Sequence, residues 1–128
     1  MPRRKPKPLT KAELKIMEVL WEKRRATVAD VAAALPPPAL AYTTVLTMLR
    51  ILEQKKVVSH STNGRAHVYL PLIERDDAAT SAIGDLVRSF FSDSRTALAV
   101  RLMAEERPSQ DELESIKTLI ARYEEEHA

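Results

Sequence analysis

Residues 42–70 read YTTVLTMLRILEQKKVVSHSTNGRAHVYL, and the change of period within them decides the fold. An apolar stripe at helical spacing runs through the first half and predicts a helix from about residue 42 to residue 55. Two β-rich runs follow, separated by Asn63–Gly64. That dipeptide predicts a β-hairpin, with positive φ expected at both of its residues. The helical stripe consists of Val45, Met48, Leu49 and Leu52.

Two shorter helices are expected before this stretch. Thr10–Lys11–Ala12–Glu13 matches the capping box that opens a helix, and Thr27 with Asp30 can open a second one. Pro36–Pro37–Pro38 ends the second helix. Three helices followed by a two-stranded hairpin are the order of a winged helix-turn-helix, here over residues 9–72. The third helix would read DNA, and the hairpin would be the wing.

The outer face of the third helix carries short hydroxyls, one guanidinium and one amide. Such side chains can approach phosphates and base edges. A plain solvated face is the alternative, but that usually mixes Glu and Lys, and Glu53 is the one acid in this helix. At the tip of the hairpin, Arg65 would add a cation. The predicted DNA-binding residues are therefore Thr43, Thr44, Thr47, Arg50, Gln54 and Arg65.

From residue 73 to residue 128 the sequence predicts three helices, over about 74–91, 94–105 and 109–125. About 55 residues bury little surface alone, so their apolar stripes would cover the first domain or a second copy of the chain. The fold class is therefore mainly α with a small β-hairpin, a winged helix-turn-helix followed by a helical dimerisation domain. The predicted dimerisation residues are Ile83, Leu86, Val87, Phe90, Phe91, Leu98, Leu102, Leu113, Ile116 and Ile120.

The net charge of +2 is unevenly distributed. Residues 1–72 hold 13 Lys and Arg against 5 Asp and Glu, and residues 73–128 hold 7 against 13. A basic first half attracts a polyanion such as DNA, whereas an acidic second half is better suited to self-association. Residues 1–8 are expected to form a disordered basic arm, which either lies along DNA or serves as a solubilising tail.

Several classes of function are excluded or disfavoured. The chain has no cysteine and two glycines, which removes thiolate metal sites, cysteine nucleophiles and glycine-rich phosphate loops. His60 and His67 lie on the expected wing without a metal-ligand set. No cofactor, metal or enzymatic activity is therefore expected. The absence of an apolar run of membrane-spanning length and of cysteines favours a soluble, cytoplasmic protein.

The sequence resembles the penicillinase-repressor family of bacteria, which includes the methicillin-resistance repressor. The resemblance rests on four segments and extends from about Leu9 to about Tyr123. Residues 41–49 (AYTTVLTML) are its most specific part and are similar to the start of that family's recognition helix. The other three segments are residues 9–21 (LTKAELKIMEVLW), the wing at 64–71 (GRAHVYLP) and residues 109–113 (SQDEL).

This resemblance implies a homodimeric repressor that binds a palindromic double-stranded DNA operator, often of resistance genes. The family's DNA-contacting positions match here at Thr43, Thr44, Thr47 and Arg65. It also implies induction through a membrane-bound sensor zinc protease, but Arg101–Leu102 stands where the β-lactam-responsive members are cleaved between Asn and Phe. The copper-responsive branch uses C-terminal cysteines, which this chain lacks. The alternative function is a winged-helix adaptor that dimerises without reading DNA.

Overall fold

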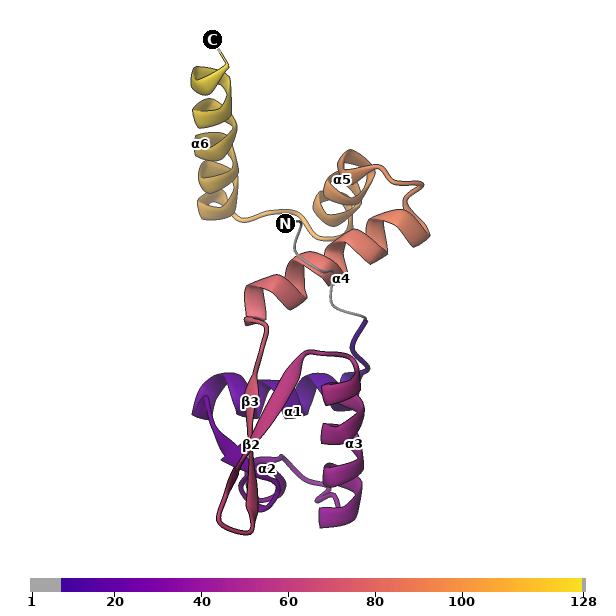
Figure 1. Ribbon diagram of the computed structural model, residues 1–128. Helices are drawn as coiled ribbons and strands as arrows, with labels where there is room; N and C mark the ends of the chain where they lie inside the picture. The colour runs from indigo at the N-terminus through magenta and orange to yellow at the C-terminus, as the bar shows by residue number, and fades with distance from the viewer. Residues whose placement is uncertain (1–7, 128) are drawn as a thin grey trace. The chain divides into compact units, whose positions relative to one another are not determined.

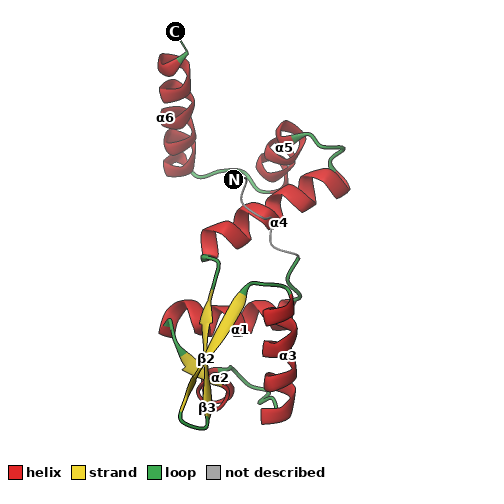
Figure 2. Ribbon diagram, in the orientation of Figure 1, coloured by secondary structure: helices red, strands yellow, loops and turns green. Residues whose placement is uncertain are grey.

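The computed structural model describes residues 8–127 and divides into two compact units between Asp85 and Leu86. The N-terminal unit holds three helices, three short strands and the first part of a fourth helix (Figures 1 and 2). Its elements are α1 (Lys11–Lys23), β1 (Ala26–Thr27), α2 (Val28–Ala34), α3 (Tyr42–Gln54), β2 (Val58–Asn63) and β3 (Ala66–Pro71). The division falls within α4 (Arg75–Phe90), and the C-terminal unit continues with α5 (Arg95–Glu105) and α6 (Gln110–Glu126).

The predicted helix starts are confirmed by their caps. The backbone N–H of Glu13 donates to Thr10 Oγ1 at 3.1 Å, and the N–H of Thr10 donates to Glu13 Oε1 at 2.8 Å. Thr27 and Asp30 form the same reciprocal pair at the start of α2. Each box satisfies two amides that have no partner within the helix, so these short sequences define where the helices begin.

The sheet has three strands rather than the two predicted. β2 and β3 form the antiparallel hairpin, and β1 pairs antiparallel with the other side of β3, so the order is β1-β3-β2. In β1, Ala26 lies opposite Tyr69 and Thr27 lies opposite Val68. Two residues are too few to show a period of two, which is why the sequence pattern did not predict β1.

The hairpin turn lies one residue later than predicted. Asn63 is the last residue of β2 and pairs with Ala66, so the two connecting residues are Gly64 and Arg65. Gly64 has a φ of +65°, whereas neither Asn63 nor Arg65 is among the residues with positive φ. The expectation of positive φ at both Asn63 and Gly64 was therefore wrong. Glycine at the first central position is the arrangement of a type II′ turn, which fits the strand twist equally well.

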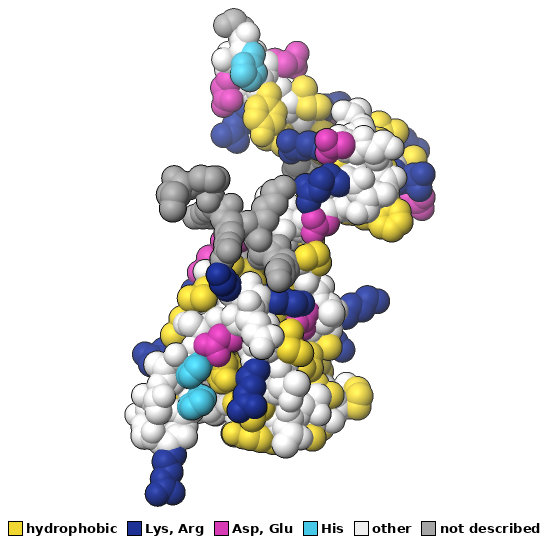
Figure 3. Space-filling view, turned by 45° about the vertical axis from the view of Figure 1, so that its right-hand side comes forward, with side chains coloured by type: hydrophobic (Ala, Val, Ile, Leu, Met, Phe, Trp, Pro, Cys, Tyr) yellow, Lys and Arg dark blue, Asp and Glu magenta, His cyan; other side chains and the backbone are white. Residues whose placement is uncertain are grey.

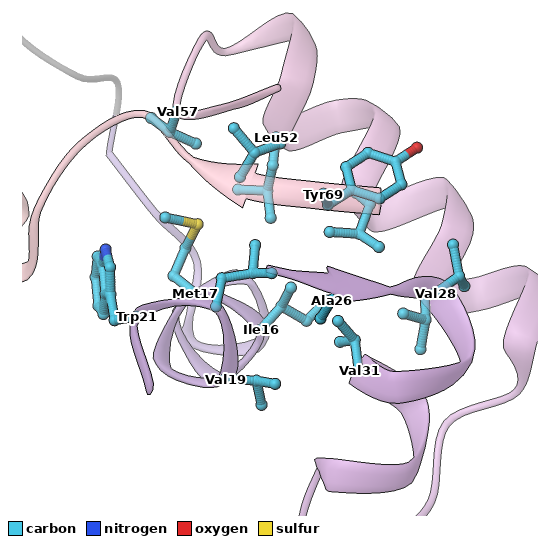
Figure 4. Close-up of a cluster of buried hydrophobic side chains, with 14 residues drawn as sticks. Ile16, Met17, Val19, Trp21, Ala26, Val28, Val31, Leu52, Val57 and Tyr69 are labelled. Carbon is cyan, nitrogen blue, oxygen red and sulfur yellow. The ribbon is translucent and has the colours of Figure 1, made fainter. Parts of the chain in front are cut away.

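The core of the N-terminal unit is formed by all three of its complete helices and its sheet (Figure 4). Ile16, Met17 and Leu20 of α1 are fully buried, and so are Leu49 and Leu52 of α3. Burying one such side chain contributes about 1.5–3 kcal/mol. The remaining buried hydrophobic residues of this unit are Val19, Trp21, Ala26, Val28, Val31, Val45, Val57, Val58 and Tyr69.

The first turn of α4 is attached to α1. The indole Nε1–H of Trp21 donates to the carbonyl oxygen of Ile73 at 2.9 Å. Arg24 makes two hydrogen bonds to the Glu74 carboxylate, at 2.8 and 3.0 Å. The guanidinium of Arg75 lies 4.9 Å from the centre of the Trp21 ring, a cation–π contact. Residues 73–75 therefore pack with the winged helix, although the sequence placed the functional domain boundary between residues 72 and 73.

The C-terminal unit has the predicted helices but little internal burial. Ser94 caps α5, and Ser109 with Glu112 forms a capping box at the start of α6. Among the described residues of this unit, Val87 is the one buried hydrophobic side chain, at 3% exposure. The predicted dimerisation residues Phe90, Leu102 and Ile120 are 78%, 62% and 52% exposed. No helix among residues 8–127 is both long and apolar enough to cross a membrane.

Candidate nucleic-acid interface

All five predicted DNA-binding residues of α3 are exposed on its surface. The helix buries one stripe, Val45, Leu49 and Leu52, in the core. Residues at positions 43, 47, 50 and 54 follow one another at helical spacing on the opposite side. We call the exposed set of Thr43, Thr44, Thr47, Arg50 and Gln54 the reading face. Helix α2 packs against α3, so the pair forms the predicted helix-turn-helix.

One hydroxyl of the reading face already has a partner. Thr47 Oγ1 donates to the backbone oxygen of Thr43, one turn earlier, at 2.9 Å. This type of hydrogen bond is common for threonine within helices. It fixes the direction of the Thr47 side chain, so that the rotamer is set before any ligand arrives.

The first turn of α3 differs from the starts of α1, α2 and α6. Those helices carry capping boxes with an acidic side chain, whereas the cap of α3 is Ala41, which makes no side-chain hydrogen bond. The first turn of α3 also holds no acid. Its backbone N–H groups therefore have no competing carboxylate and can donate hydrogen bonds to a phosphate.

The wing places its turn at the same end of the N-terminal unit as the start of α3 (Figure 1). Arg65 occupies this turn and is exposed. The space around Gly64 is open, since an added Cβ would meet nothing within 4 Å. The structure thus brings a cation on the wing and the reading face of α3 into one unit, with α3 and β2 in contact.

A cluster that the sequence did not predict joins α3 to the wing. His60 Nδ1 of β2 lies 2.7 and 2.9 Å from the two carboxylate oxygens of Glu53. The ring of His67 on β3 stacks on that of His60, with centroids 4.5 Å apart and planes 15° apart. Figure 3 shows two histidines side by side on this surface, with an acidic and a basic side chain near them. We call Glu53, His60 and His67 the wing cluster.

Tyr69 lies beneath the wing cluster. Its ring centre is 5.4 Å from that of His60, and the residue is buried. Burial raises the pKa of the Tyr69 hydroxyl, and the negative charge of Glu53 raises it further, while Arg50 opposes the shift. Glu53 and Arg50 therefore act with opposite sign on the same hydroxyl group of the sheet.

The other end of α3 is attached to the start of α1. Lys55 Nζ lies 2.7 Å from Glu13 Oε1 and 3.2 Å from the carbonyl oxygen of Pro8. Glu13 is the one buried charged residue of the described chain, at 4% exposure. Burial alone would raise the pKa of Glu13, but the hydrogen bonds from Lys55 and Thr10 and the charge of Lys55 outweigh it, so the pKa is lowered. This pair holds the reading helix against the core.

The described residues contain no group of three His, Cys, Asp or Glu side chains arranged to hold a metal ion. The wing cluster is not an exception, because its two imidazoles are stacked face to face rather than converging on one point. Residues 1–7 of the predicted basic arm lie outside the described residues. No local sequence pattern joins Glu53, His60 and His67, because they lie on three different elements.

The order of three helices and an antiparallel hairpin defines the class, a winged-helix protein. The sequence profile of the penicillinase repressor family matches residues 9–122. The transcriptional regulator BlaI of Mycobacterium tuberculosis is 35% identical over 118 residues, covering 90% of this chain and 84% of that protein. The penicillinase repressor of Bacillus licheniformis is 23% identical over 116 residues, covering 90% and 91%.

A solved structure agrees with these sequence matches. The solution structure of the DNA-binding domain of the repressor BlaI is 30% identical, with a TM-score of 0.50 over 59% of this chain and 93% of that domain. The chain belongs to the penicillinase repressor family, a class of transcriptional repressors rather than enzymes. The predicted family and fold class are thereby confirmed.

Proposed function

We propose that the protein is a homodimeric repressor that binds a palindromic operator through the reading face and the wing. The reading face carries this proposal. It presents hydroxyl, amide and guanidinium groups without an acid among them, which suits phosphates and base edges. The basic first half of the chain, with 13 Lys and Arg against 5 Asp and Glu, adds the general attraction to DNA.

Dimerisation by the C-terminal unit is the second part of the proposal. Hydrophobic side chains that a folded monomer would be expected to cover are exposed on α5 and α6, among them Val100, Leu102, Ile120 and Tyr123. Two-fold homodimers are the commonest assemblies, and their symmetry matches that of palindromic sites. Val87 belongs to the predicted set but is already buried within the protomer, so it would not contact a second copy directly. Residues 73–128 remain the proposed dimerisation domain.

Induction by cleavage is a separate matter. Arg101–Leu102 lies within α5, and both side chains are exposed. We assign no cleavage site to this bond, because neither residue is the Asn or Phe of the family's cleaved pair. A membrane-bound sensor zinc protease therefore stays a proposed partner. A repressor of chromosomal genes would act in the cytoplasm, where its operator is.

The first experiment selects duplexes from random DNA with the full-length protein and measures their affinity as salt is varied. With roughly eight to twelve phosphate contacts per dimer, affinity should fall by about three decades or more between low and near-physiological salt. Arg65→Ala should weaken all sequences similarly and lower the salt slope by about one. Lys117→Ala, an exposed cation on α6, is the matched control and should change neither.

Substitutions on the reading face test sequence readout itself. Thr44→Ala should cost about 1–3 kcal/mol on the selected duplex if a base contact is lost. It should leave binding to unrelated duplexes nearly unchanged, since it removes no charge. The alternative, an adaptor that dimerises without reading DNA, would be supported by a protein that selects no sequence. Unchanged binding by the double variant Arg50→Ala with Arg65→Ala would also contradict the proposed interface.

A further inference from the structure

The wing cluster sits where a proton would alter the charge that faces DNA. Glu53 is the one acidic side chain of α3 and lies a single turn beyond Arg50 of the reading face. DNA phosphates repel a carboxylate in this place. The side chains of His60 and Glu53 are 32% and 34% exposed, so their pairing is only partly screened by water.

We propose that protonation of the wing cluster strengthens DNA binding by cancelling the charge of Glu53, which makes operator affinity rise as pH falls through the histidine range. This inference rests on the proposed function. A neutral His60 can donate one hydrogen bond to Glu53 but leaves its negative charge in place. A protonated His60 gives a charge-assisted contact at 2.7 Å and removes the net charge of the pair.

The stack with His67 disfavours a second proton on the cluster. Two positive imidazoles with centres 4.5 Å apart would repel each other, so one proton discourages a second. Glu53 favours that proton on His60, the ring it contacts. The pair of rings therefore has two states, with and without one positive charge.

The other ionisable groups that act on the cluster's surroundings are Arg50 and Tyr42 of α3 and Tyr69 of β3. Guanidinium groups ordinarily stay protonated, and phenols ordinarily keep their proton below about pH 9. Burial raises the pKa of Tyr69, which keeps this hydroxyl neutral. Imidazole is thus the kind of side chain in this cluster that ordinarily changes charge near neutral pH.

The test measures affinity of the full-length protein for its selected duplex at about pH 6 and about pH 8, at constant ionic strength. For one partly exposed charge pair we expect the affinity at the lower pH to be higher by roughly two- to fivefold per protomer. His127→Gln, which removes the third histidine of the chain, is the control and should keep the full pH dependence.

Two variants separate this mechanism from a merely structural role. Glu53→Gln removes the same negative charge at every pH, so at about pH 8 it should bind as tightly as the native protein does at about pH 6. A structural role would instead make Glu53→Gln bind more weakly at both values. The double variant His60→Gln with His67→Gln should lose the pH dependence and remain at the weaker level.

The possible results decide between the two proposals. Native affinity that does not change with pH, or a Glu53→Gln variant that binds no more tightly than the native protein at about pH 8, would refute the wing mechanism alone. Failure to bind any duplex at either pH would refute the proposed function, and this inference with it.

Discussion

The two units of this chain bury their apolar residues in opposite ways. Every buried hydrophobic residue of the described chain except Val87 lies between Ile16 and Tyr69, in the N-terminal unit. In the C-terminal unit, large side chains such as Phe90, Leu102 and Ile120 are more than half exposed. Each unit has two helices that begin with a side-chain cap, α1 and α2 in the N-terminal unit and α5 and α6 in the C-terminal unit, so local helix signals do not distinguish the units. The difference lies in tertiary packing.

This contrast shows that helix formation and domain stability are separate properties. Caps and apolar stripes define where a helix begins and which face it buries, but a stripe stabilises a fold only when something covers it. In the N-terminal unit, the sheet and three helices bury one another's apolar side chains. For the C-terminal unit we propose that a second copy covers the exposed stripes, and the predictions below test this difference.

The largest effect is expected in the core of the N-terminal unit. Leu20→Ala removes a fully buried side chain from α1 and should lower the free energy of unfolding by about 2–5 kcal/mol, through lost burial and the cavity left behind. Urea unfolding followed by Trp21 fluorescence measures it. Leu14→Ala on the same helix is the control, because Leu14 is 39% exposed and should cost far less.

A second large effect is expected on the proposed dimerisation through the C-terminal unit. Ile120→Asp places a charge on an exposed apolar position of α6 and should weaken dimerisation at least about tenfold, since an interface core excludes unpaired charge. Sedimentation over a range of concentrations measures the dissociation constant. Thr118→Asp adds the same charge on the polar side of α6 and should leave the dimer intact. Equal behaviour of the two variants would contradict the assigned face.

An intermediate effect is expected for the ion pair that joins α1 and α3. Lys55→Met leaves the buried carboxylate of Glu13 without its cation and should destabilise the protein by about 1–3 kcal/mol at neutral pH. Urea unfolding of both proteins measures this. Lys56→Met removes a neighbouring exposed cation and is the matched control.

The same pair has a defined pH dependence. Because the pKa of Glu13 is lowered in the folded protein from its ordinary value of 4.5, its ionised form stabilises the fold above that value. The stabilisation is lost as pH falls through the lowered pKa of the folded state. The gap between native protein and Lys55→Met should therefore narrow in acid, and a gap that stays constant would argue against an ionic origin.

The smallest effect is expected at the junction of α1 and α4. The hydrogen bonds and charge of Arg24 lower the pKa of Glu74, and Glu74 raises that of Arg24, but both side chains are more than half exposed. Exposed pairs contribute little, since water and salt screen them. Arg24→Ala should therefore barely change the melting temperature, whereas Trp21→Phe, which deletes the donor to Ile73, should lower it measurably.

The sequence predicted the structural features that depend on residues close together in the chain. The capping boxes at Thr10, Thr27 and Ser109 and the stripe of α3 are local patterns, and each was found where expected. The hairpin was also predicted, but its turn moved by one residue, because the register is decided by strand pairing rather than by the Asn-Gly dipeptide.

Contacts between distant residues could not be predicted in this way. Lys55 contacts Glu13 across 42 residues, and Ala26 of β1 pairs with Tyr69 of β3, which is similarly remote in the chain. The exposure of the reading face could be predicted, because helical spacing determines which residues share a surface. The wing cluster was missed because its members come from three elements whose packing a single sequence does not reveal.

The hydrogen bond within the reading face has a consequence for the bases it can face. Since Thr47 gives its hydroxyl proton to the Thr43 carbonyl, it presents lone pairs and a methyl group outward. In the major groove, adenine and cytosine offer amino donors and thymine offers a methyl, whereas guanine offers acceptors alone. We therefore expect the duplexes selected by this protein to avoid guanine at the position that Thr47 approaches.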